Sequence, residues 1–224
     1  MEELHGQGKH CDNKVGVMYI EGAAGNFLMS VLSISPDIRY RIPNHIEFLP
    51  VDQSERQELL KWPTDWSDWQ KNVEGPMITD YETPYKFMLE KFHPGSTSRD
   101  NWDLPFSVIG TLELLKAYDK TIMITLDTPS EKDYVWNARI TRGCGNHMPE
   151  KWNKELDLIE SLKDKVDYIV PVKKITGSDS FVAQEVRNIC DIIDEDIRKP
   201  KEELITKHWK EWKKSIAKDK NDQV

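Results

Sequence analysis

The sequence predicts an α/β fold in which a mostly parallel sheet carries helices on both of its faces. Short apolar runs rich in β-branched residues alternate along the chain with segments whose apolar residues recur every three or four positions. A glycine turn, EGAAG at 21–25, joins the first such run to the first helical segment. Strands that alternate with helices form parallel sheets through right-handed crossovers, which place helices on both sides.

Length and composition predict one cytoplasmic domain. The chain has 224 residues, and we expect the domain to span 14–217 between flexible tails at 1–13 and 218–224. A net charge of −8 argues against general affinity for nucleic acid. No apolar run approaches the ~20 residues that cross a bilayer, so no membrane partner is expected. Three cysteines without CxxC spacing are typical of a reduced, cytoplasmic protein.

The first half of the chain begins clearly and then becomes less regular. Residues 15–20 (VGVMYI) predict the first strand, and 26–34 predict a helix that Pro36 ends. The elements predicted between 37 and 104 are a strand at 46–51, a helix from 54 to 60, and a helix at 84–92 capped by Thr83.

From position 106 onward, strands and helices alternate regularly. Two helix starts are marked by their caps, a Thr-Pro-Ser-Glu capping box at 128–131 and Ser178. Pro200 opens the last helix, in which apolar residues recur at helical spacing. The predicted elements are a strand at 106–109, a helix at 112–118, a strand at 121–126, helices at 128–141 and 151–163, a strand at 167–172, and the helices that begin at 178 and 200.

The turn after the first strand is a candidate anion site. Glycines at two of its positions permit backbone angles that other residues avoid. The following helix would direct its unpaired N–H groups and positive dipole end at the turn, at the sheet edge where ligands of such folds bind. The turn contains no lysine, but an amide cradle does not require one. The candidate binding residues are Gly22, Ala23, Ala24, Gly25, Asn26 and Phe27. The alternative is a tight turn without a ligand.

Two arginines form a second candidate for phosphate or sulfate binding. Arg139 and Arg142 are three positions apart on one predicted helix, so they share a face and could clamp an anion. Asp127 directly follows an apolar strand, where phosphate-binding folds often keep a metal-organising carboxylate. The alternatives are that the arginines are solvated and that Asp127 only starts a turn. We predict no metal site.

Three stretches resemble the P-loop sulfotransferase-like proteins, including short phage-encoded versions. AAGNFL (23–28) resembles their first loop, Lys-Ser-Gly-Thr-Thr-Trp-Leu, and FSVIGTLELL (106–115) resembles the strand and turn that carry a Lys-Thr-His element. The segment 121–139 resembles the part that grips the donor's 3′-phosphate. The resemblance implies a P-loop-like sheet and transfer of a sulfuryl group from an adenosine phosphosulfate donor (PAPS) to a hydroxyl of a small molecule or glycan.

The same resemblance shows that charged groups of the family are missing from their usual places. The loop lysine, the two threonines, the catalytic histidine and the donor-gripping arginine fall on Ala23, Asn26, Phe27, Leu112 and Asp127. Only Thr111 of the Lys-Thr-His element remains. Arg139, Arg142, Lys173 and Lys174 could neutralise the leaving phosphate. No residue stands out as a catalytic base, so the sequence assigns none.

Two other functions stay open. MYIEG (18–22) and LDTPSEKDYVWNARITRG (126–143) are similar to nucleoside and nucleotide kinases, although the turn is shorter than a kinase loop and lacks its lysine and hydroxyl. The third possibility is a non-catalytic P-loop module for protein interaction. It would use a face formed by Trp62, Trp66 and Trp69, which we otherwise expect to pack against the sheet.

Overall fold

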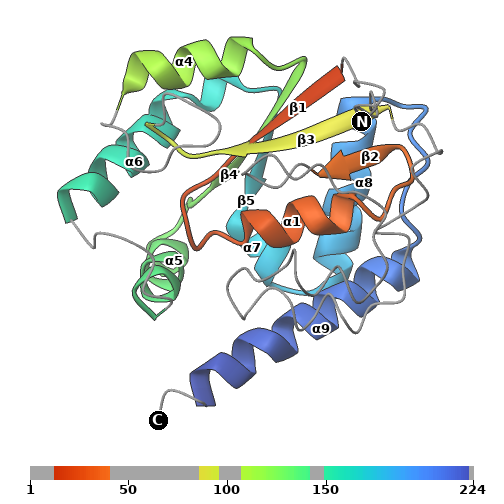
Figure 1. Ribbon diagram of the computed structural model, residues 1–224. Helices are drawn as coiled ribbons and strands as arrows, with labels where there is room; N and C mark the ends of the chain where they lie inside the picture. Colours follow the sequence, from red (N-terminus) through yellow and green to blue (C-terminus); the bar gives the residue numbers. More distant parts are fainter. Residues whose placement is uncertain (1–12, 41–85, 96–106, 142–148, 222–224) are drawn as a thin grey trace, which may run out of the picture.

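The computed structural model describes residues 13–40, 86–95, 107–141 and 149–221. Within these ranges five parallel strands form one sheet (Figure 1). They are β1 (Asn13–Met18), β2 (Ile38–Tyr40), β3 (Phe87–Phe92), β4 (Lys120–Thr125) and β5 (Tyr168–Pro171). Their order in the sheet is β2-β3-β1-β4-β5, and all neighbouring pairs are parallel. The predicted α/β fold with a P-loop-like parallel sheet is therefore confirmed.

The central strand, β1, lies between β3 and β4, with Val17 aligned with Lys91 on one side and Ile122 on the other. The chain leaves β1 towards β2 but later crosses from β3 to β4 in the opposite direction. Right-handed crossovers that run in opposite directions place their helices on opposite faces. The carboxyl end of β1 is consequently the place where connections diverge and where such folds bind ligands.

Helices cover both faces of the sheet (Figure 1). One face carries α1, α8 and α9, which contact one another, and α4 lies on the opposite face. The helices are α1 (Gly25–Leu32), α4 (Val108–Lys116), α5 (Pro129–Thr141), α6 (Pro149–Ser161), α7 (Val172–Thr176), α8 (Asp179–Ile193) and α9 (Glu202–Asn221), with a 3₁₀ turn η1 at Lys163–Lys165. No helix in these described ranges is long and apolar enough to cross a membrane.

The α1 face is closed by the C-terminal helix. The rings of Phe27 and Trp212 stack with centroids 4.3 Å apart, and Trp209 Nε1 donates to the Ile175 carbonyl at 3.1 Å. Ile205 and Trp212 are buried, which confirms the apolar spacing predicted for the last helix. That helix continues to Asn221, into the segment predicted as a tail.

The opposite face is built around a close approach at Gly16. A Cβ at this position would lie 2.5 Å from the ring of Tyr118, which follows α4. The Tyr118 ring stacks on Phe92 of β3, with centroids 5.4 Å apart. Side chains of β3 alternate between the two faces, so Glu90 and Phe92 lie on this side while Leu89 and Lys91 lie on the α1 side.

The helix caps predicted at Thr128 and Ser178 are present, whereas Thr83 lies outside the described residues. Thr128 N donates to Glu131 Oε2 at 2.7 Å and Glu131 N donates back to Thr128 Oγ1 at 3.3 Å, the reciprocal pair of a capping box. Ser178 Oγ accepts from Phe181 N at 3.3 Å at the start of α8. Glu131 also accepts from the backbone N–H of Lys173, so this cap ties α5 to α7.

Two predicted elements are wrong. Residues 87–92, predicted as part of a helix, form β3 because pairing with β1 and β2 satisfies their backbone while the helices on the two sides of the sheet bury their side chains. In place of the strand predicted at 106–109, residues 107–109 form the start of α4, where Ser107 Oγ accepts from Gly110 N at 2.9 Å as an N-cap, and residue 106 lies outside the described residues. The strand at 46–51, the helix at 54–60 and the tryptophans at 62–69 lie outside the described residues.

Candidate anion-binding site

In the turn between β1 and α1 only one of the two glycines, Gly22, adopts the left-handed angles that were predicted, while Gly25 begins the helix and Ala24 is left-handed instead. Gly22 has φ 92° and Ala24 has φ 59°, so two positions adopt left-handed angles within three residues. Ala23 N donates to the Ile20 carbonyl at 3.0 Å, and Leu28 N donates to the Ala24 carbonyl at 3.0 Å as α1 begins. The turn is therefore fixed at both ends by its own hydrogen bonds.

Several amides of this turn lack an acceptor. Among the described residues, the backbone N–H groups of Gly22, Ala24 and Gly25 make no hydrogen bond. They lie at the N-terminus of α1, where the helix dipole also favours negative charge. Not all of the predicted binding residues offer a group to a ligand. The Ala23 N–H closes the turn, and the Phe27 ring packs in the core. The backbone of the turn thus has the form of a small anion-binding nest.

Close packing explains why two positions are glycine. A Cβ on Gly22 would lie 2.9 Å from the Val135 carbonyl oxygen and 3.4 Å from Arg139 N, so the turn rests directly on α5. A Cβ on Gly25 would lie 2.3 Å from the Tyr19 ring. The tyrosine ring therefore lies against the first residue of α1, and its own exposure is only 3%.

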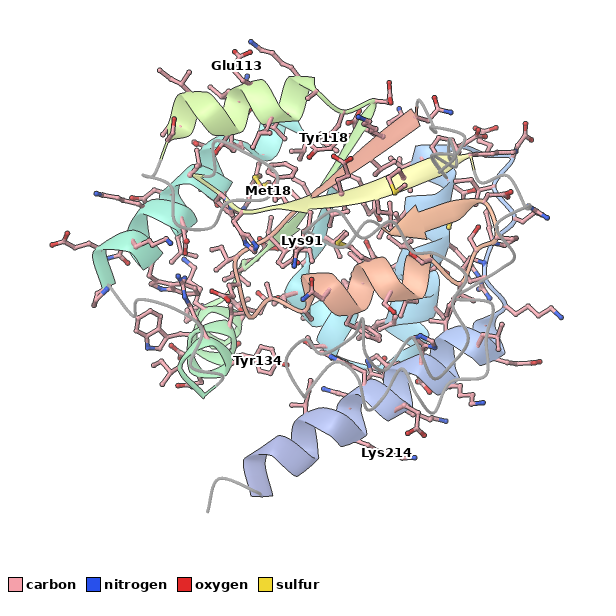
Figure 2. All side chains as sticks on the ribbon, viewed as in Figure 1. Met18, Lys91, Glu113, Tyr118, Tyr134 and Lys214 are labelled. Carbon is pink, nitrogen blue, oxygen red and sulfur yellow. The ribbon has the colours of Figure 1, made fainter. Side chains whose placement is uncertain are left out.

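A buried lysine reaches the turn from the neighbouring strand. Lys91 of β3 is 5% exposed, and its Nζ donates to Asn26 Oδ1 at 3.4 Å. Figure 2 shows this side chain extending towards the start of α1. Tyr19 donates its hydroxyl to the same oxygen at 2.5 Å. Two donors, Tyr19 just after β1 and Lys91 of β3, thus converge on one oxygen beside the unpaired amides.

The pKa of Lys91 is lowered to about 8. Burial, which disfavours the ammonium form, is the main cause, and the negative charge of Glu21 opposes it. The lysine is still protonated at neutral pH. The site therefore holds a positive charge even though the turn itself contains no lysine.

His93 follows β3 and faces the same turn. Its Nδ1 lies 2.8 Å from the Tyr19 carbonyl oxygen, and its ring meets the Tyr19 ring edge-on at 5.0 Å. A carbonyl oxygen only accepts, so Nδ1 carries the proton and Nε2, a buried atom, holds the lone pair. Burial, followed by the charge of Lys91, lowers the pKa of His93 to about 3, with smaller effects from Arg139 and Lys151. The imidazole is therefore neutral at physiological pH.

Arg139 lies beside the turn but is already engaged. Its Nη1 pairs with Glu155 Oε2 at 2.6 Å, and both side chains are buried. Burial raises the pKa of Glu155, while the charge of Arg139 opposes that rise. Arg139 Nε is buried without a partner among the described residues, as is Thr125 Oγ1 at the end of β4. Arg142, the other half of the predicted clamp, lies outside the described residues.

Other predicted site residues are occupied elsewhere. Asp127 is 3.4 Å from Lys163 Nζ in a partly exposed ion pair. Thr111 is buried, accepting from Gly95 N at 2.8 Å and donating to the Ser107 carbonyl at 3.0 Å. Leu112 and Thr111 belong to a helix, so 106–115 does not provide the strand and turn expected of a Lys-Thr-His element. Lys173 lies on the short helix α7. Within the described ranges, no three His, Cys, Asp or Glu side chains could hold a metal together.

Sequence reasoning missed Tyr19, Lys91 and His93. A signal was present, because the stretch EKFHP contains a lysine and a histidine two positions apart. The signal was not recognised because 84–92 was predicted to be a helix, and Lys91 was therefore not expected at the carboxyl edge of the sheet. No protein-family model and no curated protein matches this chain. The fold and the turn define the chain as an α/β protein with a P-loop-like sheet and a candidate anion site.

Proposed function

We propose that the chain binds an adenosine phosphosulfate donor at residues 22–27 and transfers its sulfuryl group to a hydroxyl acceptor. One observation carries the proposal. Unpaired amides at the carboxyl end of the central strand lie beside a buried lysine and a neutral histidine from the adjacent strand. Backbone donors and Lys91 supply positive potential for an anionic donor, and His93 supplies a lone pair.

Two orphaned polar atoms support a ligand at this edge. Arg139 Nε and Thr125 Oγ1 are buried without partners among the described residues. They come from the helix on which Gly22 rests and from the strand next to β1. Buried polar atoms in folded proteins nearly always have a partner, which here would be a ligand or a bound water. Phosphate and sulfate oxygens are acceptors suited to both groups.

The Lys-Thr-His element of the sulfotransferase-like proteins corresponds better to the end of β3 than to residues 106–115. A lysine and a histidine two residues apart at the end of a strand are what the Lys-Thr-His element provides. Lys91 and His93 have this spacing, with Phe92 in place of the threonine. The strand that carries them is hydrogen-bonded to β1, whose end forms the turn. With this correspondence the histidine of the element falls on His93, whereas in 106–115 it falls on Leu112.

The proposed reaction follows from these positions. The acceptor oxygen attacks sulfur, and the bond from sulfur to the bridging phosphate oxygen breaks, which leaves adenosine 3′,5′-bisphosphate. His93 Nε2 takes the proton of the attacking hydroxyl, while Lys91 and the amides of the turn neutralise the charge that grows on the leaving phosphate. Burial, and after it the charge of Lys91, makes His93 a weak base in the empty site. The negative charge of a bound donor would offset the effect of Lys91 and raise the basicity of His93.

A magnesium-dependent kinase is the less favoured alternative. P-loop nucleotide hydrolases keep a carboxylate that organises Mg²⁺ at the end of a strand beside the loop. Here that end carries the ammonium of Lys91, and the neighbouring Glu90 projects to the opposite face of the sheet. A cation at this position neutralises an anion directly, without a metal ion.

Calorimetry with adenosine 3′,5′-bisphosphate tests the proposal. We expect the wild-type chain to bind in EDTA as tightly as in Mg²⁺. Lys91→Gln should weaken binding by roughly 10- to 100-fold, the effect of one charge-assisted contact. The matched control is Lys86→Gln, on an exposed lysine just before the other end of β3. His93→Gln should retain binding but lose sulfuryl transfer to a simple phenol.

Three results would count against sulfuryl transfer. Absence of binding heat with wild-type protein at millimolar adenosine bisphosphate would remove the nucleotide site altogether. Binding of ATP only when Mg²⁺ is present would favour the kinase. Transfer activity that survives in His93→Gln would remove the proposed base.

A further inference from the structure

Asn26 makes the contacts that an anion would be expected to make. Its side-chain oxygen accepts from the Tyr19 hydroxyl at 2.5 Å and from Lys91 Nζ at 3.4 Å. It belongs to the first turn of α1, next to the unpaired amide of Gly25. An amide oxygen carries only partial negative charge, but it accepts hydrogen bonds from the same kinds of donor as a phosphate or sulfate oxygen.

We infer that Asn26 Oδ1 occupies, in the empty site, the position of an anionic ligand oxygen, so that Asn26 competes with the ligand and sets its affinity. This inference rests on the proposed function, because it concerns the same turn and the same anion. Under this inference, the Asn26 side chain must break its hydrogen bonds with Tyr19 and Lys91 before the ligand can bind. Tyr19 becomes a further donor to the ligand.

The length of the Lys91 contact supports an exchange. Charge-assisted N–H···O bonds are typically about 2.7–2.9 Å long. The Lys91 contact to Asn26, at 3.4 Å, is much longer. An oxygen with a full negative charge would interact more strongly with the same buried ammonium. For Lys91, the exchange therefore replaces a weak acceptor with a strong one.

Packing determines which partner can move. Tyr19 is held by the close approach of Gly25 and by the edge of the His93 ring, and Lys91 lies buried on a central strand. Asn26 is only half-buried and reaches the site through two rotatable bonds. Rotation of the Asn26 side chain would uncover both donors without a change in the backbone.

The test compares three chains in calorimetry with adenosine 3′,5′-bisphosphate and with inorganic pyrophosphate. Asn26→Ala should bind about 3- to 10-fold more tightly than wild type, because it removes the competing hydrogen bonds. Asn26→Asp should bind more than about tenfold more weakly, because its carboxylate pairs with Lys91 and repels the ligand. The control is Asn153→Ala, on an exposed residue of α6, which should leave affinity unchanged.

Thermal unfolding supplies a readout that binding alone does not give. Asn26→Asp should raise the midpoint, since a carboxylate in the first turn of a helix and beside a lysine is favourable. A variant that is more stable yet binds more weakly is the signature of an internal competitor.

The outcomes separate the two proposals. If wild type binds and Asn26→Ala binds equally or more weakly, Asn26 is a bystander or a ligand contact, and this inference is overturned while the proposed function stands. If neither wild type nor Asn26→Ala binds either probe, the proposed function fails and takes this inference with it.

Discussion

The contact between Gly25 and Tyr19 predicts a substitution whose effect on stability changes sign with its background. A Cβ on Gly25 would lie 2.3 Å from three atoms of the Tyr19 ring. Ordinary carbon contacts are about 3.5–4.0 Å, so the ring would have to move by more than 1 Å. It has little room, because Tyr19 is 3% exposed and its hydroxyl is bonded to Asn26.

The expected size follows from two opposing terms. Overpacking of a filled core costs about 1–3 kcal/mol. Alanine is favoured over glycine in a helix by roughly 0.5–1 kcal/mol, and less at its first residue. Gly25→Ala should therefore lower the free energy of unfolding by about 1–2 kcal/mol. In a Tyr19→Ala background the clash is absent, and the same substitution should raise it by up to about 1 kcal/mol.

Urea unfolding followed by circular dichroism gives the free energy of unfolding of the four proteins in this double-mutant cycle, which are the wild type, the two single variants and the double variant. The coupling energy between the two positions should be about 1–3 kcal/mol. A Gly25→Ala variant as stable as wild type, or one with the same cost in both backgrounds, would show that the Tyr19 ring does not lie against α1. The anion site would then lose one of the donors assigned to it.

Two predictions concern pH. Affinity for adenosine 3′,5′-bisphosphate should begin to fall as pH approaches the Lys91 pKa of about 8 and should fall by up to about tenfold per unit above it, because the neutral amine no longer attracts the ligand. The fall should stop at the affinity of the Lys91→Gln variant. His93 is already neutral in this range, so a Lys91→Gln variant with the same slope would refute the assignment. Separately, burial and the charge of Lys207 lower the pKa of His208 on α9 to about 4. The unfolded chain binds this proton near pH 6.5 but the folded chain does not, so stability should be lost as pH falls from 6.5 to 4, by at most about 3 kcal/mol. Because His93 also destabilises the folded chain over this range, His208→Leu should reduce the loss of stability without abolishing it, as measured by urea unfolding at several pH values. A loss that stays unchanged in the variant would show that His208 does not contribute to it.

Local sequence signals were sufficient wherever a segment's own residues decide its conformation. The capping box at 128–131 and the cap at Ser178 were predicted and are present, because a hydroxyl or carboxylate close in sequence satisfies the first amides of a helix. The glycine turn was predicted for a similar reason. Left-handed angles at Gly22 and the helix start at Gly25 follow from chemistry within a few residues.

The predictions failed where neighbours distant in sequence decide the conformation. The local sequence favours a helix at 84–92, because Thr83 could cap it and the proline that follows suits its first turn. Residues 87–92 form a strand instead because β1 and β2 pair with both of their edges and helices bury both of their faces.

The sequence by itself determined the fold class, the turn and the helix caps, since these depend on periodicity and on contacts within a few residues. Only the tertiary structure decided which side chains surround the turn. It brings Lys91 to within 3.4 Å of Asn26 across 65 positions of the chain, and it engages Arg139 with Glu155. The lysine absent from the turn is supplied by a neighbouring strand, because parallel strands end at one edge of a sheet whatever their distance in sequence.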